Sequence, residues 1–445
     1  MMSMKYLGKW AAGAAFLVAT LGGGASYAAE QFIPVPSYRV GAYAAGGSGV
    51  FGGMLDYFNL INERDGGING VRLVWEECEF EYRTPRAVAC YERLKDKGER
   101  GAPLFQFVST GATYSVLPRA RKDRIPVLSV GYGRSDSADG RVFPYAFPLV
   151  TTYWSQNSAK IRFIGMQEGG MERLKGKTLV NLHHGSGYGR ETVPILDRQA
   201  ERYGFRVVHL EVPHPGTEQH SQWLKIRRLN PDWVILRGWG VMNPTALKTA
   251  AKVGYPRERM VGVWWSGAEE DVIPAGDAAK GFIAAGFHPG GTGFDVHRDL
   301  KSQVYDRGLG DLDDPARVGS VYHNRGLITG MLTVEAIRRA QEKYGVRPLS
   351  GEEVRWGLEN LDLSEADIEA LGFKGLAQPL KLSCADHEGG GAVIFSQWDG
   401  ARWVPLTDWV ESDRELVRSM IEASAARYAE AQGITPRECA SPAAS

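Results

Sequence analysis

The feature that most constrains this chain is an alternation of short β-rich runs with helical patterns, which starts at Tyr38. Such alternation is typical of parallel sheets built from βα units. It breaks at residues 143–152, where Pro144 and Pro148 stand among aromatic residues, and then it restarts. With 445 residues the chain exceeds one ordinary domain. We therefore predict an α/β fold of two doubly wound parallel-sheet lobes, with strands at 38–43, 72–75, 104–108 and 126–130, then at 177–182, 206–210, 233–236 and 260–263.

The later part of the chain is predicted to complete both lobes. A further strand-like run at 281–287 leads into a Gly- and Pro-rich loop and long helical patterns, which we interpret as a return to the first lobe. Near Gly375 the chain is predicted to cross again, so that three crossovers join the lobes. We expect lobe 1 at 37–149 plus 287–375, lobe 2 at 150–286 plus 376–410, and a C-terminal helix and tail at 411–445.

The first residues indicate export. Lys5 and Lys9 precede an apolar run from Trp10 to Leu21, and small residues follow up to Ala28. The run is about twelve residues long, shorter than the roughly twenty that span a bilayer. This pattern predicts a signal peptide over residues 1–28, cleaved near Ala28, and a periplasmic mature chain.

Four cysteines bear on this interpretation. An even count in an oxidising compartment favours two disulfides, and of the three possible connectivities the sequence-local one pairs Cys78 with Cys90 and Cys384 with Cys439. The alternative is a metal site that uses Cys384 and His387. Because no second ligand pair stands at matching spacing, no metal is expected.

Charge and motif content argue against two classes of function. The 52 Lys and Arg residues balance 52 Asp and Glu residues, so no broad basic field is available for nucleic acid. Ser186 lacks the Gly two positions before it that a nucleophile elbow requires. We find no pair of nucleophile and base, and therefore expect neither catalytic residues nor an enzyme.

A glycine run raises the question of a cofactor. Gly47, Gly49 and Gly52 formally match the dinucleotide fingerprint, since they follow a predicted strand, open a predicted helix and precede Glu76 by about 25 residues. However, an exported chain meets little nicotinamide cofactor, and Gly-rich turns before helices occur in many α/β ligand-binding lobes. We expect no cofactor.

Two segments of the first lobe are candidates for ligand binding. Ser109, Thr110 and Gly111 follow the third predicted strand, where hydroxyl groups and N–H groups at a helix start suit a carboxylate. The alternative is an ordinary helix N-cap. The segment Gly131-Tyr132-Gly133 follows the fourth strand, and its alternative is a simple turn.

Aromatic residues mark the same edge of the second lobe. Tyr188, Trp239 and the adjacent pair Trp264 and Trp265 each fall just past a predicted strand. Any one of them could be a core residue. Because the carboxyl ends of parallel strands share one sheet edge, together they predict an apolar wall with a few polar groups.

The order of these blocks resembles the type I periplasmic solute-binding proteins of ABC transporters, in particular the leucine/isoleucine/valine-binding group. The resemblance runs from about residue 38 to 374. It implies two lobes joined by three crossovers, a cleft that closes on a small molecule, and delivery to permease and ATPase subunits in the inner membrane; we expect a monomer. The blocks that carry it are Gly47–Gly53, Asn62–Gly70, Ser109–Gly111, Ile125–Ser129, Tyr188-Gly189, Asn230–Asp232 and Gly276–Gly281.

The resemblance also implies roles for the candidate residues. Ser109 and Thr110 would hold a ligand carboxylate, residues 131–133 would line the same lobe, and Tyr188 and Trp239 would close from the other lobe. This chain departs from the amino-acid binders of the family at two positions.

The departures change the expected ligand. Those binders usually carry a hydroxyl residue at the position of Gly133 and an acidic residue at that of Trp264. Without these partners an α-ammonium would be buried at high cost. We therefore predict an apolar or aromatic ligand that carries a carboxylate. Branched-chain or aromatic amino acids stay possible if Glu269 or Glu270 supplies the acid, and a sensor that signals to a membrane receptor is a further alternative.

Overall fold

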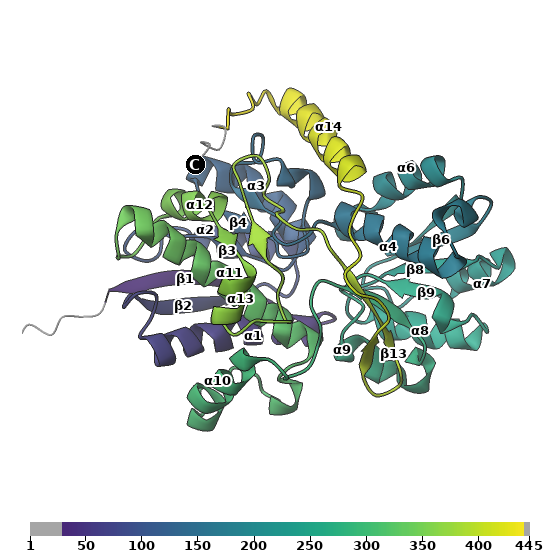
Figure 1. Cartoon of the computed structure of the whole chain (residues 1–445), viewed down its shortest axis with the longest axis horizontal. Helices are drawn as coiled ribbons and strands as arrows, with labels where there is room; N and C mark the ends of the chain where they lie inside the picture. The colour runs from purple at the N-terminus through teal and green to yellow at the C-terminus, as the bar shows by residue number, and fades with distance from the viewer. Residues whose placement is uncertain (1–28, 440–445) are drawn as a thin grey trace, which may run out of the picture.

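Two groups of β-strands, each covered by helices, lie side by side in the computed structural model, which describes residues 29–439 (Figure 1). We call the part that begins with the strand Glu30–Ser37 lobe 1 and the part around the seven-stranded sheet lobe 2. The expected signal peptide, residues 1–28, lies outside the described residues. None of the helices within 29–439 has the length and apolar character needed to cross a membrane.

Lobe 1 contains two small parallel sheets. Strand β1 (Glu30–Ser37) pairs with β2 (Arg72–Glu79), and β4 (Val127–Leu128) pairs with both β3 (Phe105–Gln106) and β5 (Ala146–Phe147). Helices cover these sheets: α1 (Ala44–Asp65), α2 (Thr84–Leu94), α3 (Thr110–Asp123), α10 (Asp295–Gln303), α11 (Val321–Tyr344), α12 (Gly351–Glu359) and α13 (Glu365–Ala370), with a short antiparallel pair, β11 (Asp362–Leu363) and β12 (Leu380–Lys381).

The first strand is not where the sequence predicted it. The expected strand at 38–43 is wrong, because β1 ends at Ser37 and α1 begins at Ala44. Pro34 and Pro36 both lie in β1. The backbone groups of successive residues in a strand point to opposite edges. The carbonyl of Ser37 points to the edge of β1 that faces β2, where it accepts a bond from Phe80 N, so the backbone nitrogens of the two prolines point to the other edge. The prolines therefore face β3, and their missing N–H groups explain why β1 is not in the sheet of β3.

The glycine run serves helix packing. It lies within α1, which crosses α11 so closely that a Cβ atom on Gly53 would lie 2.1 Å from His323 O. A Cβ atom on Gly326 of α11 would lie 2.2 Å from Val50 O in return. Only glycine permits this approach of two backbones.

Lobe 2 is built on one seven-stranded sheet in the order β14-β13-β10-β9-β8-β6-β7. Its five parallel strands are β6 (Thr178–His184), β7 (Arg206–Val212), β8 (Trp233–Arg237), β9 (Met260–Gly262) and β10 (Ile283–Gly286), and the hairpin β13 (Ile394–Trp398) and β14 (Trp403–Pro405) extends it. The helices of this lobe are α4 (Tyr153–Glu168), α5 (Gly187–Arg190), α6 (Val193–Tyr203), α7 (His220–Leu229), α8 (Met242–Lys252) and α9 (Glu269–Val272).

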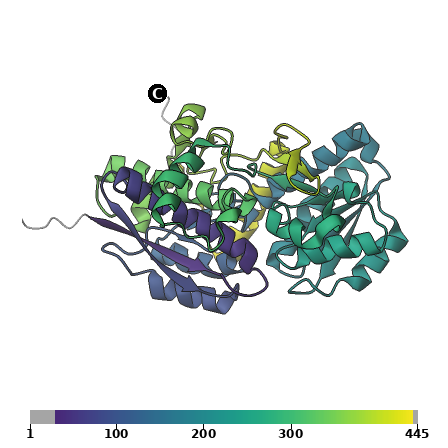
Figure 2. The same ribbon diagram turned by 90° about the horizontal axis from the view of Figure 1, so that it is seen from below.

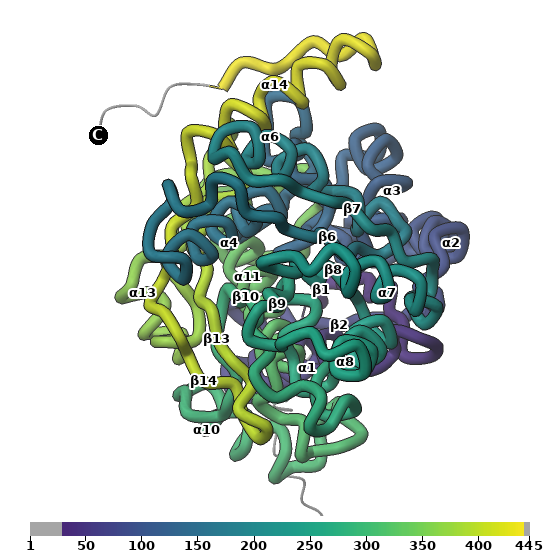
Figure 3. Tube along the Cα trace, turned by 90° about the vertical axis from the view of Figure 1, so that its right-hand side faces the viewer, coloured from purple at the N-terminus to yellow at the C-terminus, as the bar shows by residue number. Residues whose placement is uncertain are grey.

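The two faces of this sheet bury different side chains. Val180, Leu182 and Leu236 pack with Trp223 of α7 and Leu247 of α8. The opposite face of the sheet is covered by α4 and α6, as the view with lobe 2 toward the reader shows (Figure 3). The parallel strands thus have both faces buried, as α/β lobes require.

Three connections join the lobes, within residues 148–152, 287–294 and 382–393. Figure 2 shows the lobes from below, side by side. The last helix, α14 (Arg414–Gln432), then lies across both lobes, yellow in Figure 1. Its Leu416 and Ile421 pack in one cluster with Ala138 of lobe 1 and with Trp154 and Ile195 of lobe 2.

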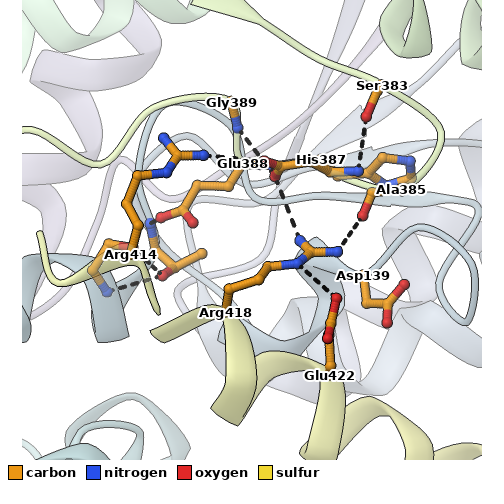
Figure 4. Close-up of polar contacts among 12 residues, drawn as sticks. Asp139, Ser383, Ala385, His387, Glu388, Gly389, Arg414, Arg418 and Glu422 are labelled. Atoms are coloured by element: carbon orange, nitrogen blue, oxygen red, sulfur yellow. Dashed lines mark hydrogen bonds and ion pairs between the residues drawn. The ribbon is translucent and has the colours of Figure 1, made fainter. Parts of the chain in front are cut away.

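Both predicted disulfides are present. Cys78 is bonded to Cys90, which ties β2 to α2. Cys384 is bonded to Cys439, which ties the third connection to the segment after α14. Close to this bond, Arg414 and Arg418 of α14 bond to the loop 383–390: Arg418 donates to Ala385 O at 2.6 Å and also contacts Glu422 (Figure 4).

A buried carboxylate joins two of the three connections. Glu388 in the third connection is 7% exposed as a residue, and its Oε1 accepts a bond from Thr152 N in the first connection at 2.6 Å. Burial, and then the nearby Asp386, raise the pKa of Glu388 from 4.5 to about 7. The folded protein therefore holds this proton more tightly than the unfolded chain does.

This shift predicts a pH dependence of stability. A raised carboxyl pKa contributes stability that is complete below about pH 4.5 and is lost as the pH rises through about 7. Relative to Glu388→Gln, which stays neutral, the free energy of unfolding of the wild type should fall by about 2 kcal/mol between about pH 5 and pH 8. Urea unfolding at both pH values measures this difference. The control is Glu422→Gln, which removes an exposed carboxylate; a constant wild-type-to-Glu388→Gln difference would contradict the prediction.

Candidate functional site

A small cavity of about 10 Å³ lies between the lobes, at the edges where the strands end. Six of the eight residues that line it are aromatic. Each follows a strand, begins a helix or follows a connection between the lobes. The residues from lobe 1 are Tyr82, Val108, Thr110 and Tyr132, and those from lobe 2 are Tyr153, Tyr188, Trp239 and Trp265.

The lobe 1 wall is held rigid by hydrogen bonds. The hydroxyl of Tyr132 donates to Leu128 O at 2.8 Å and accepts from the N–H groups of Phe107 and Val108, at 3.0 and 2.8 Å. Tyr38 donates to Val108 O at 2.9 Å. Val108 itself has φ 49°, which a β-branched residue rarely adopts. Such strain is found where the surroundings impose a conformation, as at binding sites.

The candidates at the start of α3 have different places. Thr110 lines the cavity, and its Oγ1 accepts a bond from Gly133 N at 3.3 Å. Ser109 is the N-cap, with its hydroxyl accepting from Ala112 N, and neither it nor Gly111 lines the cavity. Thr110 and Gly111 are the first two residues of α3, where N–H groups have no partner within the helix.

Gly131 and Trp264 meet each other across the cleft. Trp264 Nε1 donates to Gly131 O at 2.6 Å, and Trp265 Nε1 donates to the same oxygen at 3.2 Å. Gly131 and Gly133 both have positive φ, at 70° and 92°. Trp264 is completely buried and does not line the cavity, whereas Trp265 does.

Trp239 extends from lobe 2 into lobe 1. Its ring stacks on Tyr43 with an interplanar angle of 5° and packs against Tyr38 and Tyr82, all three in lobe 1. A Cβ atom on Gly46 would lie 2.4 Å from the Trp239 ring, so the helix α1 leaves no space there. The Nε1 donor is buried and has no hydrogen-bond partner among the described residues. A ligand acceptor could use it.

Two buried arginines stand behind the aromatic residues. The guanidinium of Arg237 lies 4.0 Å from the ring centre of Tyr153 and 4.6 Å from that of Tyr188. That of Arg325 lies 4.4 Å from the ring of Trp265. Burial lowers the pKa of Arg325 to about 10, so it stays charged at neutral pH. The cavity is thus backed by positive charge from both lobes.

The acidic residues near the cleft are engaged elsewhere. Asp271 accepts bonds from Asn243 Nδ2 at 2.7 Å, Tyr322 Oη at 2.6 Å and Ala268 N at 3.1 Å, and burial raises its pKa to about 7. None of the eight residues that line the cavity is acidic. An α-ammonium group would therefore find no carboxylate on the cavity wall.

Glu269 and Glu270 connect the lobes at the N-terminus of α11. Glu269 Oε2 accepts from Val321 N at 2.9 Å, and Glu270 Oε1 accepts from Arg317 Nη2 at 2.7 Å and Ser320 Oγ at 3.1 Å. Negative charge at this end of a helix is favourable. Both carboxylates of lobe 2 thus hold lobe 1, and the cleft is closed.

Weakening the contact between Glu270 and Arg317 should favour the open form of the cleft. Glu270→Gln keeps the acceptor oxygen but removes the charge that pairs with Arg317, a loss of about 1 kcal/mol for a half-buried pair. Because closure contributes to affinity, we expect ligand affinity to fall about fivefold. Isothermal titration of Glu270→Gln measures this. Glu63→Gln breaks ion pairs within lobe 1 only, and equal losses in both variants would contradict the interpretation.

Three residues of the cavity wall, Tyr82, Val108 and Tyr153, were not predicted from the sequence. Trp264 and Trp265 were both expected on the aromatic wall, and of the two only Trp265 lines the cavity. Tyr82 follows β2, which the sequence pattern ended four residues too early, at 75 instead of Glu79. The rule that found the other candidates, residues just past a strand, would have found it with the right strand end.

Comparison with known proteins decides the family. The profile of the periplasmic binding protein family matches residues 30–402. This chain belongs to the periplasmic binding protein family. A structure from the Pseudomonas fluorescens group, described as an ABC transporter permease, is 48% identical, with 92% of this chain and 99% of that chain covered and a TM-score of 0.86. No curated protein matches the chain.

Two more distant structures show the same fold. A branched-chain amino acid ABC transporter protein from Thermus thermophilus, with bound valine, is 22% identical, with 88% of this chain and 99% of that chain covered and a TM-score of 0.73. A solute-binding protein from R. palustris, in complex with benzoate, is 18% identical, with 87% and 97% covered and a TM-score of 0.66.

The predicted fold class and resemblance are confirmed: the chain is a type I periplasmic binding protein of two α/β lobes. This family consists of extracytoplasmic proteins that bind small molecules and work with ABC transporter permeases.

Proposed function

We propose that this protein captures a small aromatic or apolar carboxylate by hinge closure of its two lobes. It delivers the ligand to the permease and ATPase subunits of an ABC importer. In this proposal it works in the periplasm as a monomer, after removal of residues 1–28. The observation that carries the proposal is an aromatic cavity backed by Arg237 and Arg325, with no acidic residue on its wall.

The cleft is tightly closed. Its cavity of about 10 Å³ has room for about one water molecule, far less than the roughly 300 to 1,000 Å³ of usual ligand pockets. The lobes must therefore open before a ligand enters, and the aromatic side chains must then close around it. Hinge motion is for this reason part of the proposal.

The polar groups of the wall suit a carboxylate. Thr110 offers a hydroxyl and a first-turn N–H, and Trp239 offers a buried Nε1 donor without a partner among the described residues. Aromatic faces from both lobes would enclose the apolar part of the ligand. An amino acid would bring an ammonium group to a wall that lacks its partner, at a cost that the neighbouring arginines increase.

The comparisons leave both ligand classes open to this fold. The R. palustris protein binds benzoate and the T. thermophilus protein binds valine. The choice for this chain therefore rests on the residues of its own cavity, and these favour the acid.

A thermal-unfolding screen of the mature protein tests the proposal. The probes are benzoate and isovalerate, their neutral amides, and the amino acids phenylalanine and valine. A ligand at about 100 times its dissociation constant stabilises the folded state by about 2.7 kcal/mol. We expect stabilisation by an acid and not by its amide or by the amino acids. Stabilisation by valine or phenylalanine, with none by the acids, would overturn the proposal.

A further inference from the structure

A buried polar layer lies inside lobe 2, behind the aromatic wall. Tyr153 at the start of α4 packs on Arg237 at the end of β8, and Phe163 near the end of α4 packs on Trp233 at the start of β8. Helix α4 therefore runs along β8 from one end to the other. The side chains of α4 between these two contacts must lie over the middle of the sheet.

The residues at these positions are polar. Gln156 and Lys160 follow Tyr153 at intervals of three and four residues, so they share its face of the helix. On the sheet, Asn181 of β6 pairs with Ile235 of β8, midway between the two contacts, and its side chain lies on the same face as that of Ile235. Gln156 and Lys160 of the helix thus lie over the face of the sheet that carries Asn181.

Most polar atoms of these side chains have no hydrogen-bond partner within residues 29–439; an exception is Asn181 Nδ2, which bonds to His209 Nδ1 at 3.1 Å. Lys160 and Arg237 are both 0% exposed. Within residues 29–439, Lys160 Nζ, Arg237 Nη1 and Nη2, both amide atoms of Gln156 and the Oδ1 of Asn181 make no hydrogen bond. The remaining donor of Arg237, Nε, bonds to Tyr188 O at 3.0 Å. Buried polar side chains are rarely left without partners in this number.

The layer also has a net positive charge. No carboxylate within residues 29–439 forms an ion pair with Lys160 or Arg237, and Arg237 is the charged group that acts on Lys160. Burial, and then Arg237, lower the pKa of the Lys160 amine. An anion would favour the charged form of the Lys160 amine and compensate the buried guanidinium of Arg237, since buried positive charge is costly without a negative partner.

We propose that a small inorganic anion, of the size and charge of chloride, binds in this layer between Lys160 and Arg237. Gln156 Nε2 is placed to donate a third bond. Tyr153 and Tyr188 lie between this site and the ligand cavity, so the anion is a resident of lobe 2 and not the transported ligand. Arg237 also backs the ligand cavity, but the anion test does not depend on which ligand that cavity binds, so this inference and the proposed function can fail separately.

The experiment exchanges the anion. Crystals of the mature protein in sodium bromide should show an anomalous peak between Lys160 and Arg237. In solution, replacing gluconate by chloride at constant ionic strength should raise the Tm by about 2 °C at about ten times the dissociation constant. Lys160→Met should abolish both effects. Lys252→Met, at an exposed site on α8, should keep them.

The same measurements can overturn the inference. If the wild type shows no bromide peak and no chloride dependence, Lys160 is an uncharged, hydrated amine. If Lys160→Met keeps the chloride dependence, the anion binds elsewhere. The bromide peak uses the wild type alone, so the test does not depend on whether Lys160→Met folds.

Discussion

Replacing Trp239 by Leu should lower the affinity of this protein for its ligand about 100-fold. The ring forms part of the cavity and also fills the space between the lobes, against Tyr43 and Tyr82 of lobe 1. Large aromatic residues at the centre of a buried contact typically contribute at least about 2 kcal/mol to binding. The loss includes the Nε1 donor, which leucine lacks. Isothermal titration with the ligand from the thermal screen measures the effect.

A second tryptophan separates binding from stability. Trp223 of α7 is completely buried in lobe 2 against the sheet and α8, and its Nε1 donates to Gln219. Trp223→Leu should lower the free energy of unfolding by about 3 kcal/mol, as a buried large-to-small change does, while the dissociation constant stays within about twofold. Equal loss of affinity in both variants would show that Trp239 acts only through general stability.

The closed cleft combines contacts of two kinds. The aromatic contacts of Trp239 are made between the lobes at the cavity itself, and the bond from Trp264 to Gly131 O joins the lobes beside it. Glu269 and Glu270 make theirs at the N-terminus of α11, away from it. Ligand and lobe contacts therefore stabilise the same closed form, and each should strengthen the other.

The sequence predicted the lobes and the edge of the site better than the individual side chains. Alternation of strands and helices is a property of many residues, so the error at β1 did not change the fold class. Which side chain faces the cleft depends on one or two residues at the end of each strand. Trp264 and Trp265 show this, because both follow β9 and only Trp265 lines the cavity.

The arginines could not have been predicted in the same way. Arg237 stands at the end of a buried strand, where an apolar residue is expected, and Arg325 lies inside the long helix α11. What places them behind the cavity is stacking on Tyr153, Tyr188 and Trp265, which come from distant parts of the chain. No local pattern carries that information.

Removing the disulfide between Cys384 and Cys439 should have the largest effect on stability. The two residues are separated by 55 positions in the sequence, against 12 for Cys78 and Cys90. In the chain-entropy account, the free energy of unfolding that is lost on removing a disulfide increases with the length of the loop that the disulfide closes. The expected loss is about 4 kcal/mol for Cys384–Cys439 and about 3 kcal/mol for Cys78–Cys90. Paired Cys→Ser variants and urea unfolding measure both losses.

The informative result is which of the two disulfides, when removed, lowers the free energy of unfolding more. Helix α14 keeps its own contacts with both lobes through Leu416 and Ile421, and Arg437 still donates to Gly140 O. The folded state of the Cys384→Ser/Cys439→Ser variant should therefore keep its ligand affinity, while its unfolded state gains freedom. If this variant lost less free energy of unfolding than the Cys78→Ser/Cys90→Ser variant, the result would contradict this account. A loss of affinity would instead show that the bond holds α14 against the lobes and so acts on their closure.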